Sequence, residues 1–224
     1  YLIFNEGYTA TAGDDWMRPA LCEEALRLGR MLAELVPDDA EVHGLVALME
    51  IQASRTRART DSAGRPILLL AQDRSRWDRL QIGRGLAALT RAAALGGERG
   101  PYELQAAIAA CHARAPTGDE TDWVQIVALY DVLAQRAPSP VVELNRAVAV
   151  GMAFGADAAL PLVDALACDP LMQRHRLMHA VRADLLDRIG RTAEAREAFE
   201  QAAALTNNER ERVVLLARAR ALIA

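Results

Sequence analysis

The chain has 224 residues, of which 52% are apolar and 25% charged, with a formal net charge of −4 at pH 7. This length allows a sizeable buried core, and the acidic balance argues against a large phosphate-binding surface, which needs a basic patch or stripe. Aromatic residues make up only 4% of the chain, so the core must consist mainly of alanine and leucine, which suit closely packed helices. The composition therefore predicts an all-α protein that does not bind DNA usefully by itself.

Apolar segments and cysteines give two further expectations. No apolar run approaches the roughly 18 residues that span a bilayer, and no charged and then apolar leader opens the chain, so we expect no membrane contact and a cytoplasmic location. The three cysteines, Cys22, Cys111 and Cys168, are far apart, and each falls inside a predicted helix. An odd number of such cysteines predicts buried, reduced thiols and no disulfide framework.

The chain opens with the apolar run from Tyr1 to Phe4. We interpret this run as the last turns of a helix that begins further upstream, and expect the chain to be part of a longer protein. In the polar loop that follows, Asp14 or Asp15 can cap the next helix. That helix is expected from about Met17 to Leu35. It carries these apolar residues on one face: Leu21, Ala25, Leu28, Leu32 and Leu35.

The middle of the chain interrupts the helical pattern. A helix is expected from a cap at Asp38 or Asp39 to about Arg57, and residues 59–66 then have the composition of a turn. The short apolar run from Ile67 to Leu70 could form a strand of a small hairpin. Helices resume from about Arg76 to Leu95. We therefore predict one hairpin-like insertion at about residues 59–75.

A spacing of apolar residues recurs along the chain. Steps of four, three and five residues place three apolar groups on one helical face, followed by a position at which the helix ends. These stop positions are Pro37, Gly100, Pro138, Leu171 and Asn207, and the small residues about ten positions further on are Ala47, Ala110, Ala147, Ala180 or Ala183, and Ala217. The last helix is expected from Glu209 to Ile223. The spacing predicts a tetratricopeptide-like α-solenoid of antiparallel helix pairs, forming a single helical-repeat domain over residues 1–224.

Few residues have the spacing of a catalytic or metal site. His175 and His179 lie one helical turn apart, but the pattern lacks the intervening acid of metalloproteases and a third ligand. Cys111 and His112 are adjacent in a helix, where side chains point about 100° apart, so they cannot serve as nucleophile and base. Gly83-Arg84-Gly85 lies inside a helical pattern and does not follow a strand, as a phosphate-binding loop would. We predict no enzymatic activity, no cofactor and no metal.

The first candidate interaction site is formed by Asp73, Arg74, Arg76 and Trp77, at the junction of the insertion and the next helix. Arginine and indole groups could bind an acidic partner segment or a ligand there. The alternative is an internally salt-bridged helix cap with Trp77 in the core. The repeat does not require this segment, so we expect Arg76 and Trp77 to matter more for activity than for stability, unless Trp77 is buried.

The second candidate site is formed by Asn145 and Arg146, beside Glu143 on an otherwise apolar helix. Helical solenoids often use Asn and Arg on their concave helices to hold a peptide. The alternative is an internal polar network between repeats. The one dense basic run, from Arg55 to Arg59, spans five residues and is too short for more than weak DNA contact.

Three segments carry a resemblance to a known family: YLIFNEGY (residues 1–8), QDRSRWD (72–78) and SPVVELNRAVAV (139–150). They are similar to the C-terminal tetratricopeptide-like extension of one group of bacterial extracytoplasmic-function (ECF) RNA polymerase sigma factors, and the similarity spans nearly the whole chain. The resemblance implies a parent protein with two upstream helical domains that bind DNA and polymerase. Those domains are absent from this chain, so any promoter recognition would lie outside it.

The resemblance implies a regulatory domain that docks on its own sigma domains or on RNA polymerase and so controls transcription initiation. DNA would be contacted only through the missing N-terminal domains. Two alternatives remain. One is a module that senses a small molecule or peptide in a groove near Trp77 and Asn145, and the other is a general protein-binding scaffold.

Overall fold

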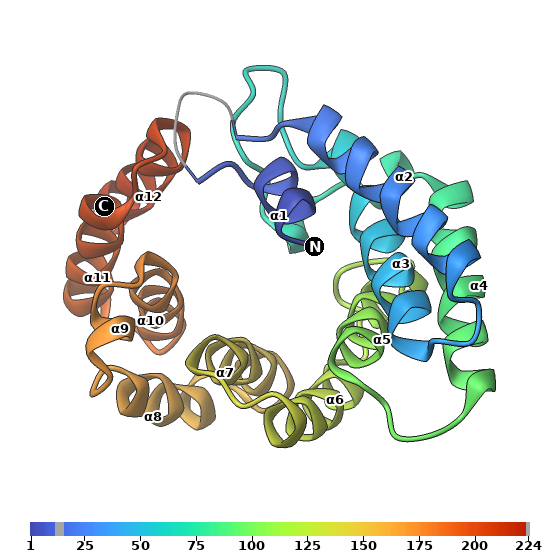
Figure 1. Ribbon diagram of the computed structural model, residues 1–224. Helices are drawn as coiled ribbons and strands as arrows, with labels where there is room; N and C mark the ends of the chain where they lie inside the picture. Colours follow the sequence, from blue (N-terminus) through green and yellow to red (C-terminus); the bar gives the residue numbers. More distant parts are fainter. Residues whose placement is uncertain (12–15, 223–224) are drawn as a thin grey trace. The chain divides into compact units, whose positions relative to one another are not determined.

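A computed structural model describes residues 1–11 and 16–222 of the chain (Figure 1). Over these residues it is helical, with no strand, which confirms the all-α prediction. The helices are α1 (Leu2–Tyr8), α2 (Pro19–Leu35), α3 (Ala40–Ala53), α4 (Arg79–Leu95), α5 (Pro101–Arg114), α6 (Trp123–Arg136), α7 (Pro140–Phe154), α8 (Ala156–Leu166), α9 (Pro170–Gln173), α10 (Arg176–Arg188), α11 (Thr192–Leu205) and α12 (Glu209–Ala221). None of the helices in these ranges is long and apolar enough to cross a lipid bilayer.

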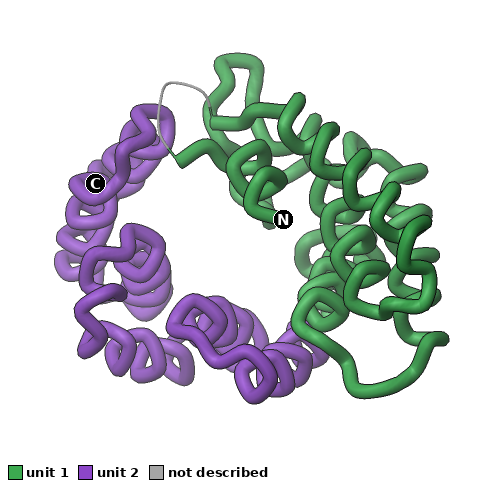
Figure 2. The backbone as a smooth tube through the Cα atoms, in the orientation of Figure 1, with its two compact units in different colours: residues 1–11, 15–122 green, residues 12–14, 123–224 purple. Residues whose placement is uncertain are grey.

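The described residues form two compact units, residues 1–11 with 16–122 and residues 123–222 (Figure 2). Helices α1 to α5 belong to the first unit and α6 to α12 to the second. Each unit has apolar core clusters of its own. The prediction that residues 1–224 act as one helical-repeat domain stays a prediction.

Helix α3 is the centre of the first unit, where it packs on α2, α4 and α5. The side chain of Asp39 caps it by accepting hydrogen bonds from the backbone N–H groups of Glu41 and Val42, as predicted. The carboxylate of Glu41 in turn accepts hydrogen bonds from the backbone N–H groups of Tyr102 and Glu103, each at 3.0 Å. Because free N–H groups at a helix start attract a carboxylate, α3 supplies the cap of α5.

In the second unit each helix packs chiefly on the next one along the chain, from α6 to α8, then to α10, α11 and α12. The Ser139 hydroxyl caps α7 by accepting a hydrogen bond from the N–H of Val142 at 3.1 Å. At the other end of the unit, the buried carboxylate of Glu211 binds the Nε of Arg176 at 2.6 Å. This ion pair joins the start of α12 to the start of α10.

Each predicted stop position lies between two helices that contact each other. The five pairs are α2 with α3, α4 with α5, α6 with α7, α8 with α10, and α11 with α12. Pro37, Pro138 and Asn207 lie between helices, and Gly100 directly precedes α5. Leu171 is wrong as a stop position, because it lies inside α9, a four-residue helix inserted between α8 and α10.

Small residues occupy helix contacts at most of the expected positions. The alanines that are fully buried, as predicted, are Ala47, Ala110, Ala147 and Ala183. Ala217 is exposed, and Ala219 is buried against α11 instead. In α12 the small buried residue therefore lies two positions later than the spacing predicts. The main helix contact of α12 within its unit is with α11.

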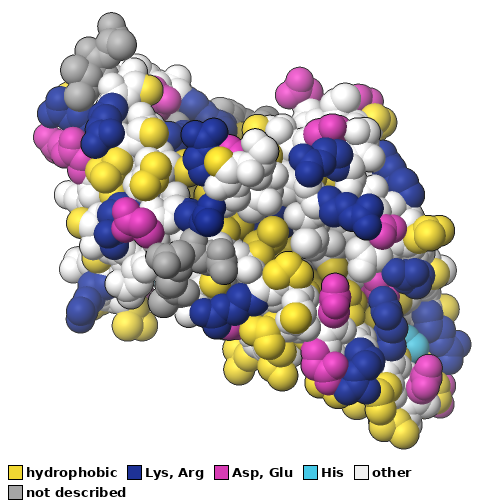
Figure 3. Space-filling view, turned by 90° about the horizontal axis from the view of Figure 1, so that it is seen from above, with side chains coloured by type: hydrophobic (Ala, Val, Ile, Leu, Met, Phe, Trp, Pro, Cys, Tyr) yellow, Lys and Arg dark blue, Asp and Glu magenta, His cyan; other side chains and the backbone are white. Residues whose placement is uncertain are grey.

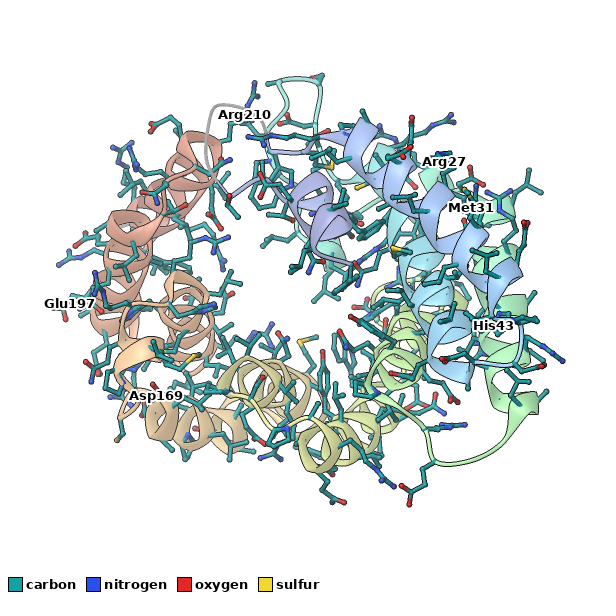
Figure 4. The ribbon with its side chains drawn as sticks, in the orientation of Figure 1. Arg27, Met31, His43, Asp169, Glu197 and Arg210 are labelled. Atoms are coloured by element: carbon teal, nitrogen blue, oxygen red, sulfur yellow. The ribbon has the colours of Figure 1, made fainter. Side chains whose placement is uncertain are left out.

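Helix α2 buries a different face from the one marked by its leucines. Its buried residues are Cys22, Ala25, Leu26 and Gly29. The three later leucines of the predicted face, Leu28, Leu32 and Leu35, are exposed by 42%, 41% and 76%. Gly29 brings α2 close to α3, since a Cβ there would come within 2.5 Å of the Met49 side chain. Arg27 and Met31 lie on the side of α2 that is turned away from α3 (Figure 4).

The insertion contains turns and short 3-10 helices in place of the expected strand. Its two arms meet at a single β-bridge between Thr60 and Pro66, and the N–H of Ile67 donates to the carbonyl of Arg59 at 2.7 Å. The strand expected from Ile67 to Leu70 is wrong, because Leu69–Ala71 forms a 3-10 helix. Proline has no N–H to extend the pairing, and within the described chain no further strand lies alongside to continue a sheet.

The cysteine prediction is confirmed for two of the three residues. Cys22 and Cys111 are buried in α2 and α5, and burial raises the pKa of both thiols. Cys168 is exposed in the turn after α8, because α8 ends at Leu166 before the expected position. Asp14 and Asp15, expected to cap the second helix, lie outside the described residues.

Candidate interaction site

Two aspartates fix the shape of the segment from residue 72 to 78. Asp73 accepts hydrogen bonds from the backbone N–H of Ser75 at 2.9 Å and from its hydroxyl at 2.7 Å. Asp78 accepts hydrogen bonds from the N–H groups of Leu80 and Gln81 at 2.9 and 3.0 Å. Asp73 thus starts the 3-10 helix Arg74–Arg76, and Asp78 starts α4. The caps decide which side chains of the segment point inwards.

Trp77 and Arg74 are the inward side chains of this segment. Trp77 is 3% exposed and belongs to the core cluster that contains Ile82. Arg74 is equally enclosed: its guanidinium donates to the carbonyls of His112 and Ala115 at 2.6 and 2.7 Å and lies 4.9 Å from the centre of the Trp77 ring. Both residues therefore form part of the interior of the first unit.

Arg55 and Arg59 extend this cluster of positive charge. The guanidinium of Arg55 lies 5.7 Å from the ring centres of both Trp77 and Tyr8. The guanidinium of Arg59 lies 3.4 Å from the Tyr8 ring and donates to the Tyr8 carbonyl. Within the described ranges, none of Arg55, Arg59 and Arg74 forms an ion pair with a carboxylate. The cluster therefore carries a net positive charge, and Glu120 acts on Arg74 only from beyond ion-pair distance.

Burial and the positive charge of this cluster together lower the pKa of basic groups within and beside it. Burial, together with the charges of Arg55 and Arg74, lowers the pKa of His112 to about 4. Burial also lowers the pKa of Arg59 and of Arg74, and repulsion from Arg55 acts in the same direction. Arg55 is therefore the central charge, because it acts on three other groups.

Arg57 and Arg76 form the exposed side of the same region. With Ser75, Trp77 and Asp78 they line a hollow in the surface of the first unit, which we call the arginine hollow. Neither guanidinium has a hydrogen bond or ion pair to any residue that the structure describes. A second hollow, of about 240 Å³, shares Arg57 and Asp78 with it.

In the sequence, the basic run and the cluster at residues 73–77 are separate features. The structure brings them together, because the insertion starts and ends at neighbouring points: the N–H of Asp78 donates to the carbonyl of Ser54 at 2.9 Å. Arg55 and Arg57 are thus residues of the site that the sequence analysis did not assign to it. The available signal was the hairpin-like insertion itself, whose two flanks must lie close together.

The second candidate cluster lies on α7, in the second unit. Arg146 is half-buried; its Nε lies 2.9 Å from the Glu143 carboxylate, and its terminal nitrogen lies 3.4 Å from that of Asp131 on α6. Asn145 is exposed on the same helix. Arg146 therefore connects two helices, as in the internal-network alternative, and Asn145 presents its amide to the surface.

The histidine pair makes local contacts. The Nε2 of His179 lies 2.8 Å from the carbonyl of Gln173, and His175 directly precedes α10. Residues 1–11 and 16–222 contain no group of three or more His, Cys, Asp or Glu side chains placed to hold a metal ion. On the face shown in Figure 3, basic side chains are interspersed with acidic and apolar ones.

Comparison with known proteins gives two findings. Residues 1–93 match a family described as "Family of unknown function (DUF6596)", and this range includes the whole arginine hollow. The chain is 46% identical over 215 residues to "Uncharacterized protein R00370" of Rhizobium meliloti (strain 1021). The match covers 94% of this chain and 49% of that protein, so the chain spans about half the length of this relative.

The low pKa of His112 is expected to make stability depend on pH. A histidine titrates near pH 6.5 when unfolded and here near 4 when folded, so between these values the unfolded state binds more protons. Stability is therefore lost as the pH falls from 6.5 towards 4, by about 2 kcal/mol at pH 5. Urea unfolding at pH 7.5 and pH 5 should show that this part of the loss is missing in His112→Gln. An equal loss in both proteins would contradict the prediction.

Proposed function

We propose that this chain is the C-terminal tetratricopeptide-like extension of an ECF sigma factor, and that it controls transcription initiation by docking on the sigma domains or on RNA polymerase. The observation that carries the proposal is the resemblance of residues 1–8, 72–78 and 139–150 to that extension. The proposal includes a cytoplasmic location and no enzymatic activity. DNA would be contacted only through domains outside this chain.

Each of the three segments has a definite place in the fold, which supports the proposal. Residues 1–8 include α1, whose Phe4 is fully buried. Residues 72–78 form the two aspartate caps and most of the arginine hollow. Residues 139–150 begin with the cap of α7. The resembling segments thus coincide with features that organise their units.

We also propose that the helix pairs form a tetratricopeptide-like solenoid. The packing of each helix of the second unit on the next one is the kind of contact that a solenoid requires. The first unit is more compact, because α3 packs on three other helices. About half of the Rhizobium meliloti relative lies outside the matched region, which is compatible with a longer parent protein.

A reconstituted transcription assay tests the proposed function. The parent sigma factor, its core without this extension, and that core with the 224-residue chain added separately would be compared on the cognate promoter with RNA polymerase. We expect removal of the extension to change transcript yield, and the added chain to reverse the change at least in part. Equal yields in all three reactions would show that the extension has no such role.

Within this assay, Arg76→Ala in the parent protein is expected to alter transcript yield by roughly fivefold. A change of this size corresponds to the binding free energy of about one exposed charge contact. Arg76 is exposed, and beyond its charge interaction with the exposed Asp73 it has no hydrogen bond or ion pair with the described residues, so the melting temperature should stay within about 1 °C. Arg220→Ala removes an exposed arginine from α12 and serves as the matched control. If both variants behave like wild type, Arg76 does not contact the partner.

The ligand-sensing alternative is compatible with the arginine hollow beside Trp77, which has a volume of about 620 Å³, and much less so with the second unit. A hollow between α7 and α10, lined by residues that include Met152 and Leu185, has a volume of about 90 Å³. Sites for small organic ligands are usually about 300 to 1,000 Å³. A thermal-shift screen of metabolites against the 224-residue chain would support this alternative if one of them raised the melting temperature in a saturable way.

A further inference from the structure

We propose that the arginine hollow binds the carboxylate side chains of an acidic protein segment. The inference deepens the proposed function. It rests on that function in one respect only, namely that the partner is a protein. It assigns the contact to Arg57 and Arg76. Trp77 lines the hollow with them, and its ring also lies against the half-buried Arg55 and the buried Arg74.

The charges of the hollow are unbalanced. Arg57 and Arg76 are exposed, and neither guanidinium is paired with a described residue. Asp78 is the one acid in the wall, and one of its carboxylate oxygens already accepts two hydrogen bonds from the start of α4. Asp73 interacts with the charge of Arg76 without a direct ion pair, so an added anion in the hollow would meet two guanidinium groups that have no hydrogen-bonded partner among the described residues.

The positive charges of Arg55 and Arg74, which lie against the Trp77 ring, also favour an anion in the hollow. Arg55 and Arg74 both lie against the Trp77 ring, and neither is paired with a carboxylate of the described chain. The indole Nε1 of Trp77 is buried and has no hydrogen-bond partner among the described residues. The exposed guanidinium groups offer hydrogen-bond donors and the enclosed ones add positive charge, and an acceptor-rich anion complements both.

A protein carboxylate fits this region better than a nucleic acid does. The basic groups are confined to residues 55–59 and 74–79, and the whole chain carries a net charge of −4. Such a chain repels a long polyanion outside the immediate contact, whereas a short acidic segment needs only the local field. The planar guanidinium fork also matches the two oxygens of a carboxylate. Beside the hollow, Leu80 is 77% exposed and offers an apolar contact to a peptide.

The test uses the 15N-labelled 224-residue chain and the peptide acetyl-Ala-Glu-Glu-Ala-Glu-Glu-Ala-amide. The indole N–H resonance of Trp77, identified by its loss in Trp77→Phe, reports on the wall of the hollow. We expect a saturable shift of this resonance with the Glu peptide and none with the same peptide carrying Gln in place of Glu. The double variant Arg57→Gln/Arg76→Gln should bind about tenfold more weakly, and Arg220→Gln should bind like wild type.

The inference is overturned if the wild-type chain shows no saturable shift with the Glu peptide, and two further outcomes also overturn it. One is binding of the Glu peptide by the double variant within twofold of wild type, provided that its melting temperature is unchanged. The other is a shift at equal concentrations of inorganic phosphate that matches the peptide's, which would make the hollow a phosphate site. Failure of the transcription assay alongside peptide binding would remove the proposed function and leave this inference. Loss of peptide binding with an extension that still alters transcription would remove only the inference.

Discussion

Replacing Gly44 with alanine is expected to destabilise the first unit by about 3 kcal/mol. A Cβ at this position would lie 2.6 Å from the backbone nitrogen of Glu103 and 2.9 Å from its Cα. Both atoms belong to the backbone of α5, so no side chain can rotate out of the way. Helices α3 and α5 would have to separate, and the hydrogen bonds from the start of α5 to Glu41 would lengthen.

Urea unfolding followed by circular dichroism measures this effect. The matched control is Gly83→Ala on α4, where an added Cβ meets no atom within 4 Å. Since alanine favours a helix over glycine, that control should gain roughly 0.5 to 1 kcal/mol. If Gly44→Ala unfolded at the same urea concentration as wild type, the close approach of α3 and α5 would be refuted.

The second large effect is expected for Trp77→Ala, which should lower the free energy of unfolding by about 3 to 5 kcal/mol. The indole is almost fully buried among the apolar side chains of α3, α4 and α5. Its removal would leave a cavity and would also take away the ring against which Arg55 and Arg74 lie. The two guanidinium groups would then lose their cation–π contacts with the ring.

Thermal and urea unfolding of Trp77→Ala and Arg76→Ala separate the roles of the two neighbours. Arg76→Ala should stay within about 0.5 kcal/mol of wild type, because the side chain is exposed. The sequence alone predicted that both residues matter more for activity than for stability. The burial of Trp77 favours the stated alternative for that residue, while the prediction for Arg76 stands. Wild-type stability in Trp77→Ala would mean that the indole does not fill the core.

Helices and their caps could be predicted because their signals are local. Asp39 caps α3, and α12 begins at Glu209, both as expected. The apolar face of α2 was less informative, since periodicity shows that leucines share a face without showing that a neighbouring helix covers it. Gly29 decided the packing on α3 instead, because it leaves room for the Met49 side chain. Cys22 packs on α1, where its Sγ lies 3.6 Å from the carbonyl oxygen of Phe4. Burial of a helix face depends on its partner, which the local pattern does not contain.

The candidate site shows the same limit in an irregular segment. The sequence placed Asp73, Arg74, Arg76 and Trp77 in one cluster, and the structure turns Arg74 and Trp77 inwards and Asp73 and Arg76 outwards. Helical or strand periodicity would distinguish inward from outward positions, but a short 3-10 helix between two turns has neither. The contribution of Arg55 and Arg57 depended on the closure of the insertion, a contact between residues far apart in the chain.

The different packing of the two units has a consequence for how they open. Because α3 contacts α2, α4 and α5 at once, amide protons of these four helices should exchange with solvent in one cooperative event. In the second unit each helix depends mainly on its neighbour, so α12 can detach while the contacts of α6 with α7 persist. Protection from exchange should therefore be uniform across α2 to α5 and graded along the second unit. The graded unit has the looser helices that a partner could order on binding.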